Sequence, residues 1–321
     1  MKNKMKFICK SALNDAQLRH AVGLGADGIE LQLYEEFYVS PKSVKTYGWG
    51  KFVNLQRLAQ YPITAIHMPI RKENSTNFEN LLVVDHANVF TNICSLANAI
   101  GHERTSRVLV VMHCEMSYNQ LNETGLLELI AEKLRIILAK YPYVELGIEN
   151  LMPIVTKDNK VGLRNGFADS NVQLVKDLRM RLHVNRIGTV LDTCHALSSI
   201  RIMQEIYTNI LDMPDAMCGV EYYMRSNAGV CSEIHLASVK GFGFKEDEHG
   251  VAFDEQSPMS IEAFVEMYRD MHYECPICIE MREQDYCNRL NFIKTREDIK
   301  ALLPTKEIPC FDEDSVFLKR L

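Results

Sequence analysis

Short apolar runs alternate with longer amphipathic segments over most of the chain. An apolar run that lacks polar alternation is typical of a strand buried on both faces. Eight runs have this character, at residues 5–9, 28–32, 63–67, 107–113, 144–149, 187–192, 233–237 and 276–280. Between them, apolar residues recur at the i, i+3, i+4 spacing of helices at residues 15–24, 84–100, 124–140, 171–182, 261–271 and 296–303. Asn14 and Ser260 are expected to cap two of these helices.

This order predicts one closed (β/α)8 barrel, a TIM barrel, over residues 1–304. An open nucleotide-binding sheet would usually carry a glycine-rich phosphate loop, and Gly241-Phe-Gly243 is too short for one. Residues 305–321 follow Pro304 and mix acidic and aromatic side chains. We expect this C-terminal tail to pack on the outside of the barrel.

The last residues of the predicted strands carry the candidate chemistry, because in a barrel they converge on one site. Strands three to eight end with residue types that bind metals: His67, His113, Glu149, Asp192, His235 and Glu280. His195 lies three residues after Asp192, and the loop after strand seven adds Asp247 and His249. The pattern therefore gathers nine possible ligands at one mouth of the barrel.

Each of these residues alone would more often be structural, held by an ordinary hydrogen bond. Together they need cations, since four carboxylates in one small volume repel one another. Five imidazoles beside four carboxylates favour a divalent transition metal, with zinc preferred and manganese as the alternative. Nine ligands exceed the needs of one ion, and with one bridging carboxylate they suffice for three.

The order of these residues, and the Asp192-Thr-Cys-His195 run above all, resembles the endonuclease IV family of apurinic/apyrimidinic endonucleases (AP endonuclease family 2). That family lies within the xylose isomerase-like barrel superfamily, and the resemblance covers about residues 5–300. It implies hydrolysis of a phosphodiester, abasic-site DNA being one candidate, with Glu149 aligning the attacking hydroxide. It also implies three zinc sites: His67, His113 and Glu149; Glu149, Asp192, His235 and Glu280; and His195, Asp247 and His249.

The flanks of the motifs depart from this family. Glu248 stands where the family has an Arg between the loop Asp and His, and Leu236-Ala-Ser follows His235 in place of Asn-Asp. Candidate substrate contacts are Arg71 and Lys72 for phosphate, Tyr38 and Trp49 for stacking, and also Lys240 and Arg282. The segment around Arg71 is equally consistent with an ordinary surface loop, and the segment around Tyr38 with a lid packed over the barrel mouth.

The superfamily also offers a second interpretation, a sugar or sugar-phosphate isomerase or epimerase. One divalent metal held by Glu149, Asp192, His235 and Glu280 would orient a ketose, and the two glutamates would shuttle protons at carbon. Glu149 and Glu280 are thus the expected catalytic residues. This interpretation leaves His67 and His113 without a role. Epimerases of this type also place an Arg where this chain has Gly241.

Composition narrows the class of protein further. The chain has 321 residues, with 36 Lys and Arg against 42 Asp and Glu, so the net charge is −6. This balance argues against a generally basic, non-specific nucleic-acid binder. We find neither a membrane span nor a secretory signal and expect a cytoplasmic protein with reduced cysteines. Cys275-Pro-Ile-Cys278 has no second pair at zinc-binding spacing, so we expect it to have a structural role.

Overall fold

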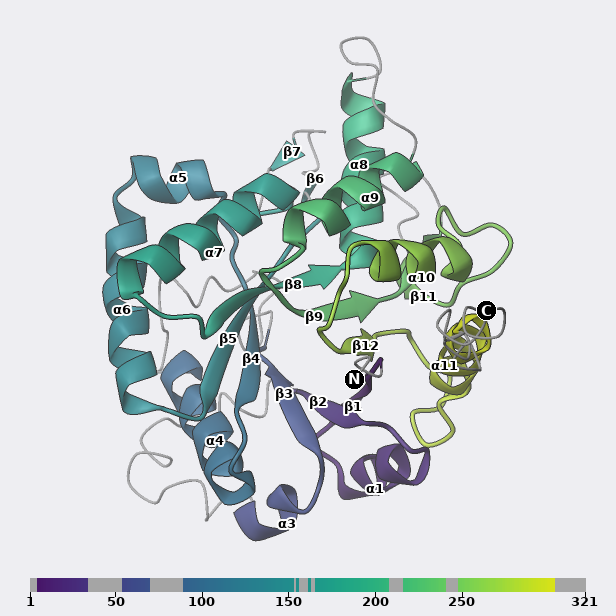
Figure 1. Ribbon diagram of the computed structural model, residues 1–321, viewed down its shortest axis with the longest axis horizontal. Helices are drawn as coiled ribbons and strands as arrows, with labels where there is room; N and C mark the ends of the chain where they lie inside the picture. Colours follow the sequence, from purple (N-terminus) through teal and green to yellow (C-terminus); the bar gives the residue numbers. More distant parts are fainter. Residues whose placement is uncertain are drawn as a thin grey trace, which may run out of the picture.

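The computed structural model describes residues 5–33, 54–69, 89–152, 154–155, 161–162, 165–207, 216–240 and 248–303. In these ranges, eight parallel strands close into a barrel in the order β1-β12-β9-β8-β5-β4-β3-β2. Helices surround the barrel (Figure 1). The predicted (β/α)8 barrel is therefore confirmed. Its strands are β1 (Phe7–Ala12), β2 (Gly28–Gln32), β3 (Ile63–His67), β4 (Val108–His113), β5 (Val144–Glu149), β8 (Ile187–Asp192), β9 (Cys231–Leu236) and β12 (Ile277–Ile279).

The helices include several that periodicity did not predict. Helices α3, α5, α8 and α9 are additional, and α11 begins at residue 290 rather than 296. The Asn14 and Ser260 caps are confirmed, because each side chain accepts backbone N–H groups of its helix. The helices are α1 (Asp15–Gly23), α3 (Leu55–Ala59), α4 (Val89–Arg104), α5 (Tyr118–Glu123), α6 (Leu126–Lys140), α7 (Ala168–Leu182), α8 (Thr193–Tyr207), α9 (Ala216–Asn227), α10 (Ile261–Asp270) and α11 (Leu290–Leu302).

Helix α8 was missed because it begins directly where β8 ends. No turn residue separates Asp192 from Thr193, so the change from strand to helix leaves no Gly or Pro signal. The Asp192 carboxylate accepts a hydrogen bond from the backbone N–H of His195 at 2.8 Å, which is a capping interaction. The cap fixes the short path from Asp192 to His195.

Two small antiparallel ribbons lie outside the barrel sheet. The first pairs β6 (Ile154–Val155) with β7 (Val161–Gly162), and the second pairs β10 (Ser238–Lys240) with β11 (Glu248–Val251). Val239 is opposite His249 in the second ribbon. This ribbon follows β9 and contacts α8, so it carries residue 249 back towards the mouth of the barrel.

Side chains alternate between two environments along every barrel strand, as the two-residue period of a strand requires. In β2, Ile29 and Leu31 belong to the main hydrophobic core, whereas Glu30 is buried among polar residues inside the barrel. A small apolar cluster fills the interior below the polar residues: Ala65, Leu109, Val111 and Val190. Gly147 lies beside this cluster, and a Cβ there would come within 2.6 Å of Val190. The interior beside Gly147 is therefore closely packed, and the candidate ligands lie above it.

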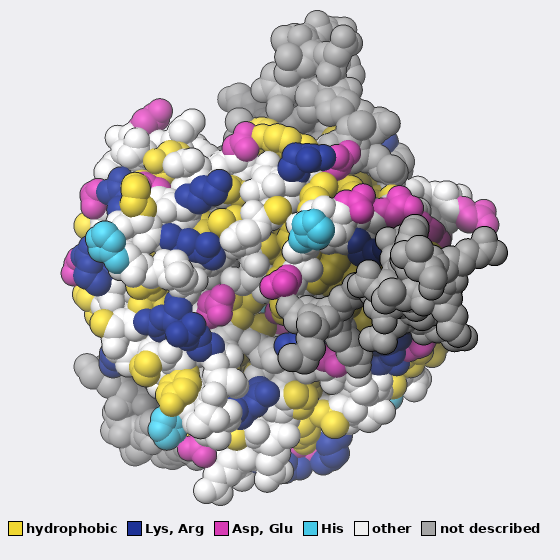
Figure 2. Space-filling model, in the orientation of Figure 1, with side chains coloured by type: hydrophobic (Ala, Val, Ile, Leu, Met, Phe, Trp, Pro, Cys, Tyr) yellow, Lys and Arg dark blue, Asp and Glu magenta, His cyan; other side chains and the backbone are white. Residues whose placement is uncertain are grey.

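On the face seen in Figure 2, the basic and acidic side chains of the described residues are interspersed. Among the described helices, none has the length and apolar character needed to cross a membrane. The predicted C-terminal tail, residues 305–321, lies outside the described residues, as does the start of the helix predicted at residues 84–100.

Candidate metal centre

A cavity of about 540 Å³ opens at the carboxyl ends of the barrel strands. Its wall includes six of the predicted metal ligands: His67, His113, Glu149, Asp192, His195 and Glu280. His235 lies behind them and is fully buried. The structure therefore brings together the seven predicted ligands whose side chains it describes, on strands or strand ends that are neighbours in the barrel.

Glu149 lies at the centre of this arrangement, at the end of β5. Its Oε2 is 3.0 Å from Nε2 of His67 and 3.0 Å from Nε2 of His113. The Nδ1 of His67 is 2.8 Å from the Met68 carbonyl and donates to it. That hydrogen bond orients the ring so that Nε2 faces Glu149. His67, His113 and Glu149 offer ligand atoms within 4.8 Å of one another, close enough to hold one cation.

A second group shares Glu149 and lies on the opposite side of its carboxylate. His235 Nδ1 is 2.6 Å from Glu280 Oε2 and 3.7 Å from Glu149 Oε1. Together with Asp192, these three residues also offer atoms within 4.8 Å of one another. Each group of ligands could hold a cation, and Glu149 is the one residue common to both.

His195 reaches the same volume from the first turn of α8. Its Nδ1 lies 3.0 Å from the carbonyl oxygen of Asn150, 3.2 Å from Glu149 Oε1 and 3.5 Å from Asp192 Oδ2. Asn150 also exchanges two hydrogen bonds with the backbone of Asp192, at 2.8 and 3.0 Å. With Nδ1 donating to Asn150, a metal bound by His195 would be held through Nε2. Asp192 and His195 are therefore linked by a backbone hydrogen bond. The His195 imidazole lies beside Asn150 and Glu149, whereas the Asp192 carboxylate also belongs to the group with His235 and Glu280.

Because these ionisable side chains lie so close together, they shift one another's pKa values. Burial opposes ionisation of Glu149, but the surrounding imidazoles, His113 first, hold the pKa of its carboxyl well below the usual range. Burial likewise opposes ionisation of Glu280, yet Lys10 and His235 lower its pKa to about 2. Burial disfavours the charged form of His195, while Asp192 and Glu149 raise its pKa to about 9. Divalent cations fit this site because they can replace the imidazole protons as partners of the carboxylates.

Several predicted residues are not tested by these contacts. Tyr38, Trp49, Arg71, Lys72 and Asp247 lie outside the described residues. His249 is described only as a backbone position in β11, and the next residue, Gly250, lines the cavity. The third predicted group of ligands is thus represented here by His195 alone.

The two remaining substrate candidates are placed differently. Arg282 lines the cavity, and its backbone N–H donates to the Gly250 carbonyl at 2.7 Å. Lys240 ends β10 with a half-exposed side chain, and its Nζ is 3.2 Å from Asp254. It is not part of the cavity wall, so the geometry brings Arg282 but not Lys240 to the site.

Sequence reasoning missed two charged residues beside the ligands, Lys10 and Glu30. Strand β1 continues to residue 12, whereas the prediction ended it at residue 9, so Lys10 was not recognised as a strand residue. Glu30 lies inside a strand that was predicted correctly, between Ile29 and Leu31. Since those neighbours face the helices, the period of the strand already places Glu30 inside the barrel. That alternation was the available signal.

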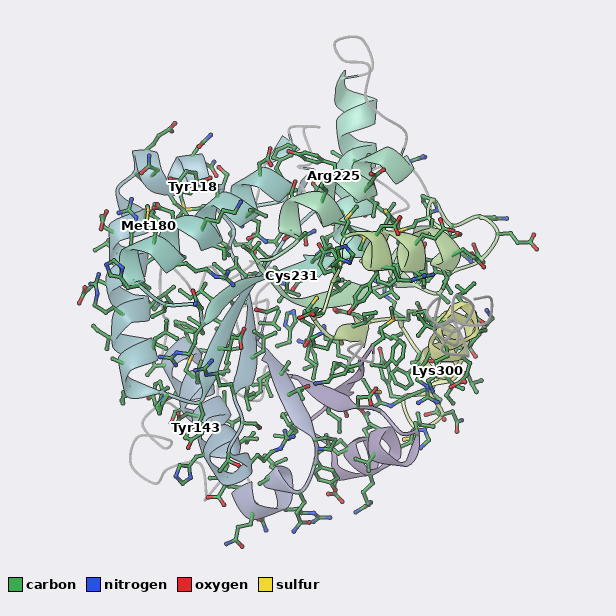
Figure 3. The ribbon with its side chains drawn as sticks, viewed as in Figure 1. Tyr118, Tyr143, Met180, Arg225, Cys231 and Lys300 are labelled. Atoms are coloured by element: carbon green, nitrogen blue, oxygen red, sulfur yellow. The ribbon has the colours of Figure 1, made fainter. Side chains whose placement is uncertain are left out.

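The Cys275-x-x-Cys278 motif does not form one site. Cys275 is hydrogen-bonded to Cys231, the first residue of β9, which is labelled in Figure 3. Cys278 is buried inside the barrel near Glu30, Glu233 and His235. The two thiols therefore have different neighbours.

Comparisons with known proteins agree with the architecture. No protein-family model matches the sequence, and no curated protein matches it either. Among solved structures, a D-tagatose 3-epimerase-like protein matches with a TM-score of 0.55 at 15% identity, covering 93% of this chain and 97% of the other. An AP endonuclease of family 2 from Brucella melitensis gives 0.53 at 14% identity, covering 88% and 95%. The IolI protein, whose structure holds a zinc atom, gives 0.54 at 13% identity, covering 92% and 97%.

At these identities the likeness establishes the fold alone. The matching structures include enzymes of different kinds, and xylose isomerase domain proteins are among them. The chain has the xylose isomerase-like (β/α)8 barrel fold.

Proposed function

We propose that this chain is a metal-dependent enzyme that hydrolyses a phosphodiester at a multinuclear cation site. The observation that carries the proposal is Glu149, whose two oxygens face two different groups of ligands. Oε2 contacts His67 and His113, while Oε1 faces His195 and His235. A buried carboxylate with ligands on both sides is suited to bridging two cations, an arrangement that recurs in phosphoryl-transfer enzymes.

The donor set supports zinc, with manganese as the alternative, because imidazoles and carboxylates are mixed in both groups. Divalent cations bound there would act as Lewis acids and supply a nucleophile at neutral pH. In this proposal Glu149 holds the two cations at a fixed separation. Glu280, whose side chain is 29% exposed, lines the cavity and would be the ligand of the second group nearest to the substrate.

The same geometry and the resemblance in the motifs support a phosphodiester as the substrate class. A second cation next to the Glu149, Asp192, His235 and Glu280 group would take His67 and His113 as ligands, and phosphodiester hydrolysis uses such a pair of cations. A duplex with one abasic site is the first substrate to test, since the order of the nine predicted ligands resembles endonuclease IV. Arg282 is the described cation on the cavity wall, besides Lys10, that is placed to contact a phosphate.

A sugar isomerase or epimerase is the second candidate, and one observation favours it. Both glutamates approach the same nitrogen, His235 Nδ1, at 2.6 and 3.7 Å, so one cation could hold a ketose between two carboxylates. The cavity volume of about 540 Å³ also suits a small ligand. This alternative uses only the second group of ligands.

Two substitutions separate these functions. The purified protein is loaded with zinc or manganese, and its metal content, cleavage of an abasic-site duplex and interconversion of ketoses are measured on one sample. If the hydrolase proposal is right, His113→Ala and His235→Ala each abolish cleavage, and His102→Ala, on an exposed helix end, leaves it intact. His249→Ala is also expected to abolish cleavage.

The sugar isomerase predicts a different pattern, in which His235→Ala abolishes activity and His113→Ala preserves it. The number of metal ions bound per chain tests the proposal independently of activity. We expect close to three ions per chain, and a reproducible single ion would rule out the multinuclear site.

A further inference from the structure

Beneath the candidate ligands lies a second layer of charged groups that metal binding does not require directly. Lys10 of β1 and Glu30 of β2 are paired in register, and their side chains meet with Nζ 3.0 Å from Oε1. Glu30 is completely buried, and the Lys10 side chain is 13% exposed. Burying two charges so deeply is costly. The pair therefore calls for an explanation in terms of what else it contacts.

Glu30 contacts the candidate ligand His235 on the side turned away from the other ligands. The Nε2 of His235 is 2.9 Å from Glu30 Oε2, whereas its Nδ1 faces Glu280 and Glu149. An imidazole can donate from one nitrogen and bind a cation with the other. With Nε2–H donating to Glu30, the lone pair of Nδ1 points towards the Glu149, Asp192 and Glu280 group. Carboxylates placed in this way orient histidine ligands in many metal sites.

Lys10 connects the same carboxylate to a second candidate ligand. Its ammonium group contacts Glu30 and also forms an ion pair with Glu280, just after β12. Strands β1 and β12 are the first and last strands of the barrel and pair with each other at its closing seam. Across four neighbouring strands, the contacts therefore run from Glu280 through Lys10 and Glu30 to His235.

We propose that Lys10 and Glu30 form a positioning dyad for one cation of the candidate centre. The inference rests on the proposed metal site and goes beyond it by assigning roles to two residues that bind no metal. Glu30 holds the His235 ring with Nδ1 towards the cation, and Lys10 holds the Glu280 carboxylate beside it. The dyad acts on the Glu149, Asp192, His235 and Glu280 group, since its ion pairs are with His235 and Glu280.

A different use of the same residues is a separate cation site made of Glu30, Glu233, His235 and Cys278, whose ligand atoms also lie within 4.8 Å of one another. The position of Lys10 argues against it. The ammonium group, 3.0 Å from Glu30, already supplies positive charge at that carboxylate. A cation there would also compete for the Nε2–H that Glu30 accepts from His235.

The test uses zinc affinity, measured by competition with a chromogenic chelator, and the visible absorption of the Co²⁺-loaded protein, which reports ligand geometry. Glu30→Gln keeps the size of the side chain and removes its charge. We expect one bound ion to weaken by about ten- to a hundredfold, the usual effect of losing an outer carboxylate partner, with a changed cobalt spectrum. The ion held by His67, His113 and Glu149 should keep its affinity.

Glu233→Gln is the matched control. Glu233 is as deeply buried as Glu30, in the same strand as His235, but its Oε1 lies 3.5 Å from Nε2 instead of 2.9 Å. Zinc affinity should stay within about twofold of the wild-type value, below the effect expected for a true outer partner. An equal loss of zinc affinity in Glu30→Gln and Glu233→Gln would overturn the dyad. It would indicate that changing any buried carboxylate near His235 weakens zinc binding.

Wild-type zinc affinity in Glu30→Gln would overturn the inference while leaving the proposed function standing. A wild-type protein that takes up no cation would overturn the proposed function, and the dyad with it. Lys10→Gln is the second variant if Glu30→Gln does not fold, and wild-type affinity there would also reject the dyad. In the double variant, the loss should not exceed that of the more damaging single change, because the two residues act as a unit.

Discussion

The two sides of the candidate centre obtain their positive charge in different ways. On the side formed by β3, β4 and β5, the Glu149 carboxylate meets the imidazoles of His67 and His113. On the side formed by β9, β12, β1 and β2, the ammonium group of Lys10 is built in between Glu30 and Glu280. The contacts of the first side are with imidazoles, whose charge depends on protons or metal ions. The second side combines one imidazole, that of His235, with a permanent cation.

This difference indicates how the two sides should respond to perturbation. Removing metal ions or protons changes the charge balance on the first side directly, because imidazole charge depends on pH. The second side also contains the imidazole of His235, but it keeps the ammonium group of Lys10 when protons or metal ions are removed. Glu149 belongs to both sides, so a change there tests the whole centre.

The largest effect is expected for Glu149→Gln. Loss of the one carboxylate shared by both groups should reduce metal uptake to one ion or fewer and lower hydrolytic activity by about a thousandfold or more. Metal analysis and a cleavage assay on the same preparation check this. Glu145→Gln provides the control, since Glu145 is on the same strand and pairs with Ser232 at 2.9 Å, away from the ligands. Full activity in Glu149→Gln would contradict a bridging role.

Lys10→Met should be the most damaging change to the stability of the metal-free protein. It leaves Glu30 and Glu280 without their shared cation, and breaking a buried ion pair typically costs about 3–5 kcal/mol. Urea unfolding measures the loss of free energy. Lys300→Met is the control, because Lys300 (labelled in Figure 3) pairs with Glu297 on the surface of α11. A surface pair contributes about 1 kcal/mol or less. Equal losses of unfolding free energy in the two variants would show that the buried ion pairs of Lys10 stabilise the protein no more than a surface pair does.

The imidazole of His195, which contacts Glu149, should give the metal-free protein a pH dependence. The pKa of His195 is about 9, above its ordinary value of 6.5, so its stabilising contribution is complete below pH 6.5 and is lost as pH rises through 9. Burial also raises the pKa of Glu233 from 4.5 to about 8. The unfolded chain loses this proton at a lower pH than the folded protein, so Glu233 also lowers the unfolding free energy as pH rises towards 8. We expect unfolding free energy to fall by up to about 3 kcal/mol between pH 6 and 9 for His195 alone.

Thermal or urea unfolding of the chelator-treated protein across this pH range provides the measurement. His195→Gln should flatten the curve, and bound zinc should remove the loss, since a metal replaces the imidazole proton. A flat curve for the metal-free wild-type protein would mean that His195 is not held protonated by Asp192 and Glu149.

The smallest effect is expected for Cys278→Ala. Cys278 is buried beside His235 but takes part in neither candidate group that contains Glu149. We expect unchanged metal content and a stability loss of about 1 kcal/mol from the lost packing. Loss of one bound ion would instead support a cation site among Glu30, Glu233, His235 and Cys278.

Much of the barrel was predictable because its strands and core-facing helices follow simple periods. Strands β2, β3, β5 and β8 begin and end where the apolar pattern indicated. Among the missed helices, α3 and α5 are only five and six residues long, and at α8 the capping residue Asp192 is itself the last residue of the strand. The side chains of Asp247 and His249, and those of the predicted substrate contacts on the 34–51 and 68–72 loops, stay predictions.

The sequence by itself determined the barrel and the ring of ligand residues. The succession of strands and helices along the chain, and the residue at which each strand ends, can be read from local patterns, and closure of a parallel barrel brings the strand ends together. Only the tertiary structure decided which atoms meet. It turned the two oxygens of Glu149 towards different histidines and placed Lys10 and Glu30 behind His235 and Glu280. The Lys10–Glu280 contact crosses the seam where the first strand pairs with the last, and Glu149 meets His235 across β8, so no local pattern encodes these contacts.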